Sequence, residues 1–221
     1  MASRGTILPM PLPAPPSRAE PRWPAVLAII ATGLAYSALP DSLSVGPRWL
    51  LLVIVGALEV PIFISHRRGY VALYNALGYV VSAIVTLFTV FSLGLLVAAL
   101  PARSETPVAL LVSAACLWVS NILVFALWYW RLDAGGPTGR DRAPGHTEGA
   151  FLFPQMTLYA TRGTWSPRFI DYLFLAFNTS TAFSPTDVPI LSRWAKVLVM
   201  LQSLISLVTV ATLAARAINI L

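Results

Sequence analysis

The chain has 221 residues, of which 57% are hydrophobic and only 11% are charged. Soluble globular domains carry about 25% charged residues, so this composition excludes an ordinary soluble domain and predicts a membrane protein. The net charge of +6 and the pI of about 10.0 come from basic residues that are scattered between apolar runs. Without a patch that combines basic and aromatic residues we expect no nucleic-acid binding. The positive charge instead indicates membrane topology and contact with anionic lipid head groups of the bilayer.

Five stretches are candidates for membrane spans, since a transmembrane helix needs about 20 mostly apolar residues. Residues 1–22 come first and are rich in proline and arginine, which predicts a disordered or extended tail. We therefore predict an all-α polytopic membrane protein with this tail, a three-helix region at 23–106 and a C-terminal unit at 107–221. The five candidate spans cover approximately residues 23–39, 48–65, 72–100, 107–130 and 191–219.

The longest polar region lies between the last two of these spans, at 131–166. It begins RLDAGGPTGRDRAPGH, which is typical of a loop throughout. We expect Asp133 and Asp141 to be solvated there, paired with neighbouring arginines. The following FLFPQMTLYATRGTW is apolar and aromatic but too short and too broken to span, and it predicts an interfacial segment.

A short helix is predicted next, because Ser166 is a good N-cap and Pro167 fits the first helical position. It would run to about Thr181, a length of roughly 22 Å at 1.5 Å per residue, against a hydrocarbon core of about 30 Å. The polar stretch with Pro185 follows, and non-helical backbone at membrane depth is tolerated only inside protein or beside water. We therefore predict a re-entrant half-helix; a helical hairpin with its hinge at the interface is the alternative.

This C-terminal unit resembles the pore domain of potassium channels, which has an outer helix, a short pore helix, a T-x-T-T-V-G-Y-G-D filter and an inner helix. Aligned on Asp187, the chain has threonine at two motif positions, and Pro189 falls where such channels often carry a proline. The resemblance covers about the last 55 residues, or about 90 if 107–130 is the outer helix. It implies a homo-oligomer, a tetramer, with filter-like residues at Thr179, Thr181, Phe183, Ser184, Pro185, Thr186 and Asp187.

The chain departs from the filter motif at three positions: Ser184 and Thr186 replace the two glycines, and Pro185 replaces the tyrosine. The filter needs backbone angles that glycine permits, and proline fixes φ and removes an N–H. We therefore do not expect potassium selectivity. The negative C-terminal end of the half-helix and a ring of Asp187 carboxylates would still favour a monovalent cation. The chain is also similar to uncharacterised bacterial integral membrane proteins with the same F-x-P-T-D motif, a resemblance that implies no known function.

Polar residues inside the predicted spans form the second set of candidates. Glu59 lies well inside the second span, where a carboxylate is costly and hence a functional candidate; alternatively, a protonated Glu59 could donate to the carbonyl that Pro61 frees. On the last span one polar stripe would either line a pore or join helices by hydrogen bonds, with Asn75 and Asn121 as candidate partners. The stripe consists of Gln202, Ser206 and Thr209.

Arginines predict the orientation of the spans, because basic residues concentrate on the cytoplasmic side. They place the N-terminus, the loop with Arg67 and Arg68 and the region 131–168 inside, and only Arg48 and Arg103 outside. The loop that leads into the half-helix is therefore inside, whereas a potassium channel has it outside. A half-helix that crosses fully, an inverted pore loop or a failure of the rule would each resolve this conflict.

We hypothesise a channel-like pore-forming protein of the plasma (bacterial inner) membrane that favours cations. The alternatives are a structural or accessory membrane subunit without conduction, and a proton-coupled carrier that uses Glu59. Nucleophile–base arrangements, paired carboxylates and phosphate-binding loops are absent from the sequence, so we expect neither an enzyme nor a cofactor. Cys116 is the single cysteine and has no partner for a disulfide or a metal cluster.

Overall fold

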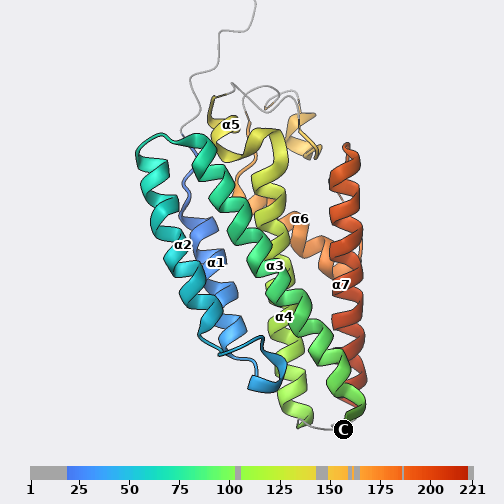
Figure 1. The fold of residues 1–221 in the computed structure, drawn as a ribbon. Coiled ribbons are helices and arrows are strands. Elements are labelled where there is room, and N and C mark those ends of the chain that lie inside the picture. Colours follow the sequence, from blue (N-terminus) through green and yellow to red (C-terminus); the bar gives the residue numbers. More distant parts are fainter. Residues whose placement is uncertain are drawn as a thin grey trace, which may run out of the picture.

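The computed structural model describes residues 19–102, 106–142, 149–158, 161, 165–185 and 187–218, and these residues form an all-helical bundle (Figure 1). The predicted tail, apart from residues 19–22, lies outside this range. Five helices run along the bundle: α1 Trp23–Ser37, α2 Leu50–Arg67, α3 Val71–Ala102, α4 Pro107–Leu132 and α7 Arg193–Ile218. The shorter helices are α5 Gly136–Arg142 and α6 Phe169–Ala182, with single 3-10 turns at η1 Asp41–Leu43, η2 Asp133–Gly135 and η3 Pro154–Met156.

Four helices of the described chain are long and apolar enough to cross a membrane, namely α2, α3, α7 and the segment that begins with α4. They expose large apolar side chains such as Val60, Phe63 and Met200, as a lipid-facing surface requires. The first predicted span is shorter than expected. Helix α1 has only 15 residues, about 22 Å at 1.5 Å per residue, because the chain turns at Pro40 into η1.

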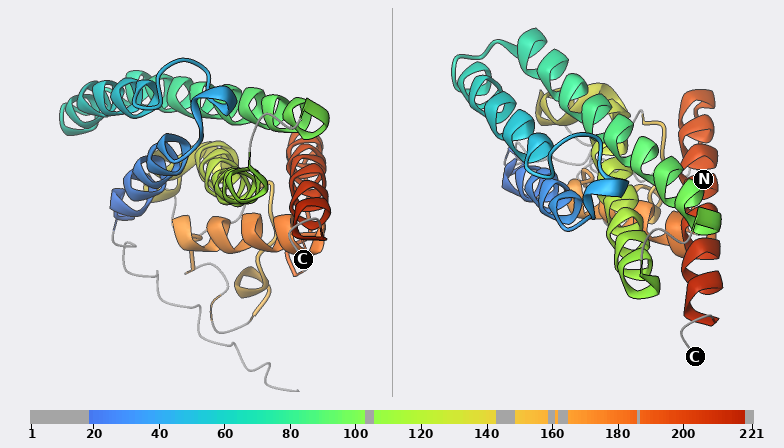
Figure 2. Two further views of the ribbon diagram at one scale, coloured as in Figure 1. Left: turned by 90° about the horizontal axis from the view of Figure 1, so that it is seen from below. Right: turned by 60° about the horizontal axis from the view of Figure 1, so that its bottom comes forward.

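Helix α4 is the centre of the bundle. It packs against α1, α3, α6 and α7, and Figure 2 shows it surrounded by these helices when the bundle is viewed from below. Its start follows from the sequence: the Thr106 side chain accepts a hydrogen bond from the Ala109 N–H at 3.2 Å, and Pro107 occupies the first turn. Its position explains why so many of its side chains are buried.

Helix α6 descends along α4 from the end of that helix to its middle. The Phe169 ring contacts Trp130 with centroids 5.9 Å apart, and two turns later Phe177 contacts Trp118 at 6.2 Å. The helix begins two residues later than predicted, because the Asp171 carboxylate accepts a 2.7 Å hydrogen bond from the Arg168 N–H and so caps the turn that starts at Phe169. At its other end Phe183 adopts the left-handed conformation and terminates the helix.

After α6 the chain returns to the end of the bundle from which α6 started. Ile190 forms an antiparallel bridge with Phe151, and the Leu191 N–H donates to the Ala150 carbonyl at 2.8 Å. The Ala150 N–H in turn donates to the Asp133 carboxylate, just beyond α4. Helix α7 then runs back along the bundle (Figure 1). The chain before α6 and the chain after it therefore meet at one end.

The described parts of the region 131–166 contain more regular structure than the predicted loop. The chain continues from α4 into η2 and α5. In the aromatic segment, Phe151 and Phe153 are buried against Tyr172. The prediction that Asp133 is solvated is wrong. Its buried carboxylate accepts from the Tyr172 hydroxyl at 2.6 Å and from the Ala150 N–H at 2.5 Å. A carboxylate buried in this way is stabilised by donors from distant parts of the chain.

Two adjacent glycines make the sharp turn between α4 and α5, and they give a matched test. Both have a φ near +75°, but only at Gly136 would an added Cβ lie 2.7 Å from the Arg131 carbonyl oxygen, whereas at Gly135 it would meet nothing. We expect Gly136→Ala to lower the free energy of unfolding by about 2 kcal/mol and Gly135→Ala by about 1 kcal/mol. SDS titration of both purified variants in mixed micelles measures the difference; equal losses would contradict the steric argument.

Candidate functional site

The residues that resemble a channel filter fall into two groups. Thr179 is fully buried, and its hydroxyl donates to the Leu175 carbonyl at 2.9 Å. Residues beyond it lie on the outside of the single chain: Thr181, Ser184 and Asp187 are exposed, and Phe183 is 43% exposed. Pro185 is half-buried, and Thr186 lies outside the described residues. The end of α6 therefore presents a mainly polar surface that this chain does not cover.

The C-terminal end of α6 lies about halfway along the bundle. Ser180, in the last turn of α6, accepts from the Asn121 amide at 3.4 Å and from the Gln202 amide at 2.9 Å. Asn121 precedes the end of α4 by 11 residues and Gln202 follows the start of α7 by nine, or roughly 16 and 14 Å at 1.5 Å per residue. Helix α6 consequently ends at the level of the middle of both long helices.

The polar stripe of α7 is buried inside the chain, where α4, α6 and α7 meet. Gln202, Ser206 and Thr209 are each 0% exposed. The Gln202 amide group donates to the Ala176 carbonyl at 2.7 Å, and its oxygen accepts from the Tyr129 hydroxyl at 2.5 Å. One side chain of α7 thus satisfies polar groups of both α4 and α6.

Ser206 and Asn121 complete this junction. The Ser206 hydroxyl donates to the Ser180 carbonyl at 2.6 Å and accepts from the Trp118 indole at 3.2 Å. The Asn121 amide also donates to the Gln202 backbone carbonyl at 3.3 Å. By contrast, the Thr209 hydroxyl donates only to Ile205 on its own helix, and Asn75 lies on α3 away from the junction. These contacts favour the interhelical role of the stripe over the pore-lining role.

Glu59 lines a cavity between α1, α2, α3 and α4. The cavity also contains Arg131, which the sequence analysis assigned to the polar loop but which continues α4 and is only 5% exposed. Sequence reasoning missed this partner, although no glycine or proline interrupts the helical pattern before Gly135. The structure therefore adds a buried cation to the predicted intramembrane acid.

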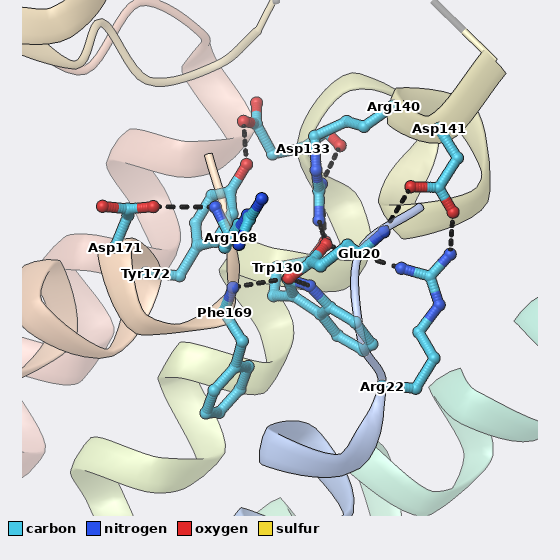
Figure 3. A network of polar contacts seen from close by, with 10 residues as sticks. All are labelled: Glu20, Arg22, Trp130, Asp133, Arg140, Asp141, Arg168, Phe169, Asp171 and Tyr172. Carbon is cyan, nitrogen blue, oxygen red and sulfur yellow. Dashed lines mark hydrogen bonds and ion pairs between the residues drawn. The ribbon is translucent and has the colours of Figure 1, made fainter. Parts of the chain in front are cut away.

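A second polar cluster joins the N-terminal segment to the last turn of α5 and the start of α6 (Figure 3). Its centre is the Glu20 carboxylate, whose side chain is 8% exposed. One oxygen accepts from the Trp130 indole at 2.8 Å and from the Phe169 N–H at 2.6 Å. The other accepts from Arg140 at 3.3 Å and from Arg22 at 3.5 Å. Glu20 thus holds the first turn of α6 against the end of α4.

The partners of Glu20 are themselves anchored. Arg22 pairs with Asp141 at 2.5 Å. Asp141 is therefore paired with an arginine of the N-terminal segment, whereas the prediction paired it with arginines of its own loop. Arg140 is buried and donates to the Trp130 and Asp133 carbonyls, each at 2.9 Å. The sequence analysis missed this cluster because it placed Glu20 in a disordered tail. Across the described residues no three histidine, cysteine or carboxylate side chains could together hold a metal ion.

Comparison with known proteins gives no match: no family model, curated protein or solved structure is significantly similar to this chain.

Proposed function

We propose that this chain is the subunit of a channel-like, homo-oligomeric membrane pore in which α6 is a re-entrant half-helix. The observation that supports it is the exposed polar end of α6, halfway along the bundle, followed by a return of the chain to the end where α6 began. At that depth an uncovered polar backbone costs several kcal/mol per group. Water or other copies of the chain would remove this cost.

Five spans and an inverted pore loop agree best with the arrangement of the helices. Helix α1 is short but apolar and lies beside α2 and α4, so we include it as a span. The α2–α3 turn, the end of α4 and the start of α7 lie at one end of the bundle (Figure 1). They carry five basic residues, namely Arg67, Arg68, Arg131, Arg193 and Lys196. The positive-inside rule makes this end cytoplasmic in a bacterial inner membrane. Helix α6 would then enter the membrane from the cytoplasm.

Cation preference follows from the charges around the end of α6. The C-terminus of a helix carries roughly half a negative charge, and Asp187 adds a carboxylate that is exposed in the single chain. Copies arranged around an axis at this surface, four if the potassium-channel resemblance holds, would bring several such charges together. The buried stripe of α7 would have no contact with the ion and would instead hold α6 in place.

A non-conducting accessory subunit is the second candidate, because the stripe of α7 is satisfied within one chain. In that case the exposed end of α6 would contact a different membrane protein. The mass of the purified protein in detergent and cation flux through liposomes distinguish the two functions. A homo-oligomer that conducts supports the pore, and a monomer without flux contradicts it.

Replacement of Asp187 by asparagine is expected to lower cation flux by about tenfold at low salt, because the carboxylate ring raises the local cation concentration. The loss should shrink at high salt, where the charges are screened. Asp41→Asn is the matched control: it removes an exposed carboxylate in η1, at the other end of the bundle. Equal flux in the wild type and Asp187→Asn at low salt would contradict the proposed place of Asp187.

A further inference from the structure

The cavity that holds Glu59 lies apart from the α6 surface, among the first four helices. Its volume is about 70 Å³, and apolar side chains such as Ala25, Ile29 and Ile62 form much of its wall. A water molecule needs a polar cavity of about 10–15 Å³ on this measure and two or more polar partners. Both conditions are met, since the cavity is several times larger and contains the charged groups of Glu59 and Arg131.

Arg131 is a buried cation without a carboxylate at ion-pair distance among the described residues. Its guanidinium lies so close to α3 that a Cβ at Gly78 would fall 1.8 Å from Nη1. The Trp130 ring lies 5.4 Å from the guanidinium carbon, and the Tyr74 hydroxyl interacts with it. The Nε–H finds no acceptor in the described chain. Such a cation requires an oxygen acceptor in the cavity.

Glu59 faces this cation from α2. One of its carboxylate oxygens is buried and has no hydrogen-bond partner among the described residues. The charges of Glu59 and Arg131 are close enough to interact, yet the two side chains do not form a direct ion pair. The cavity is therefore lined by a half-buried carboxylate and a buried guanidinium cation that are not paired directly, and water in it would satisfy both.

We propose that this cavity is a hydrated proton-binding site, in which the Glu59 carboxylate takes up a proton from water to become a carboxylic acid and Arg131 stabilises the deprotonated form. The other titratable or charged groups that face the cavity are Arg22, His66 and Tyr74. Arg22 is held by Asp141 and Glu20. His66 is exposed, two turns along α2 from Glu59, and its ring lies 5.3 Å from Tyr74.

Infrared difference spectroscopy tests the site without any assay of transport. The protein in liposomes is titrated between about pH 4 and pH 9, and the C=O stretch of a protonated carboxylic acid is followed. We expect one such band to grow as the pH falls and to be missing from Glu59→Gln. A spectrum in which no band depends on Glu59 over this range would overturn the proposal.

Variants of the cation test the role of Arg131. An opposite charge favours the charged form of a carboxylate, so Arg131→Gln should move the midpoint of the Glu59 band upward by about one pH unit or more. Arg131→Lys keeps the charge and should stay near the wild type. If Arg131→Gln fails to fold, Arg131→Met, which also removes the charge, replaces it. Asp41→Asn changes an exposed carboxylate beyond the other end of α1, so it is a control away from the cavity and should leave the midpoint unchanged. A midpoint that is the same in all three variants would show that Arg131 does not act on Glu59.

The proton-binding site and the proposed pore can be tested independently of each other. The infrared signal requires only a folded chain, whereas the pore requires an oligomer and the end of α6. If Glu59 titrates but the protein conducts no cations, the result supports the proton-binding site. It then favours the proton-coupled carrier over the channel.

Discussion

Replacement of Gln202 by methionine is expected to lower the free energy of unfolding by about 3 kcal/mol. Methionine keeps the length of the side chain but removes its amide. The Tyr129 hydroxyl would lose its acceptor and the Ala176 carbonyl its donor, and both groups are buried. A buried polar group left unsatisfied costs about 1–3 kcal/mol, and interhelical hydrogen bonds in membranes are worth about 0.6–2 kcal/mol each. SDS titration in mixed micelles measures the loss.

Thr209→Val is the matched control, because Thr209 belongs to the same stripe and is equally buried. Its hydroxyl donates only to the Ile205 carbonyl on α7, so an isosteric valine leaves α4 and α6 untouched. We expect a change of less than about 1 kcal/mol. Equal losses in the two variants would mean that Gln202 does not join the three helices. A change in cation flux through the Thr209 variant would restore the pore-lining role of the stripe.

The sequence predicts the helices of this chain well, because local chemistry decides where they start. Thr106 and Pro107 mark the first turn of α4, and the predicted span 107–130 differs from the observed helix by two residues at its end. The short helix was predicted at about 167–181 and observed at Phe169–Ala182. The observed start is two residues later than the predicted one, because the Asp171 carboxylate accepts from the Arg168 N–H and caps the helix there.

The sequence could not predict which groups lie next to each polar residue in the folded chain. Glu59 was identified as an intramembrane acid from its position alone, but Arg131 faces it from a helix more than 70 residues away, and no local pattern links the two. Similarly, the spacing of the α7 stripe gives one helix face but not what packs against it. The α7 stripe is buried against α4 and α6 through tertiary packing. This packing determines that the stripe contacts protein and not water.

Loss of the Glu20 side chain is expected to have the largest effect of all, about 4 kcal/mol for Glu20→Ala. Four donors converge on this carboxylate, from Trp130, Phe169, Arg140 and Arg22. Removal of one partner from a buried charge cluster costs about 3–5 kcal/mol, because the remaining charges stay buried without compensation. Arg140 is the charge most affected here, since its side chain is only 2% exposed.

Glu20→Gln should lose about half as much, because the amide oxygen can still accept from Trp130 and Phe169 while its NH₂ group faces the arginines. Asp41→Ala, which breaks the exposed pair with Arg48, should cost less than about 1 kcal/mol. Hydrogen exchange adds a local test: Glu20→Ala should accelerate exchange in the first turn of α6 but not in α2 or α3. An α6 that remains protected would show that its docking depends on the Gln202 junction and not on Glu20.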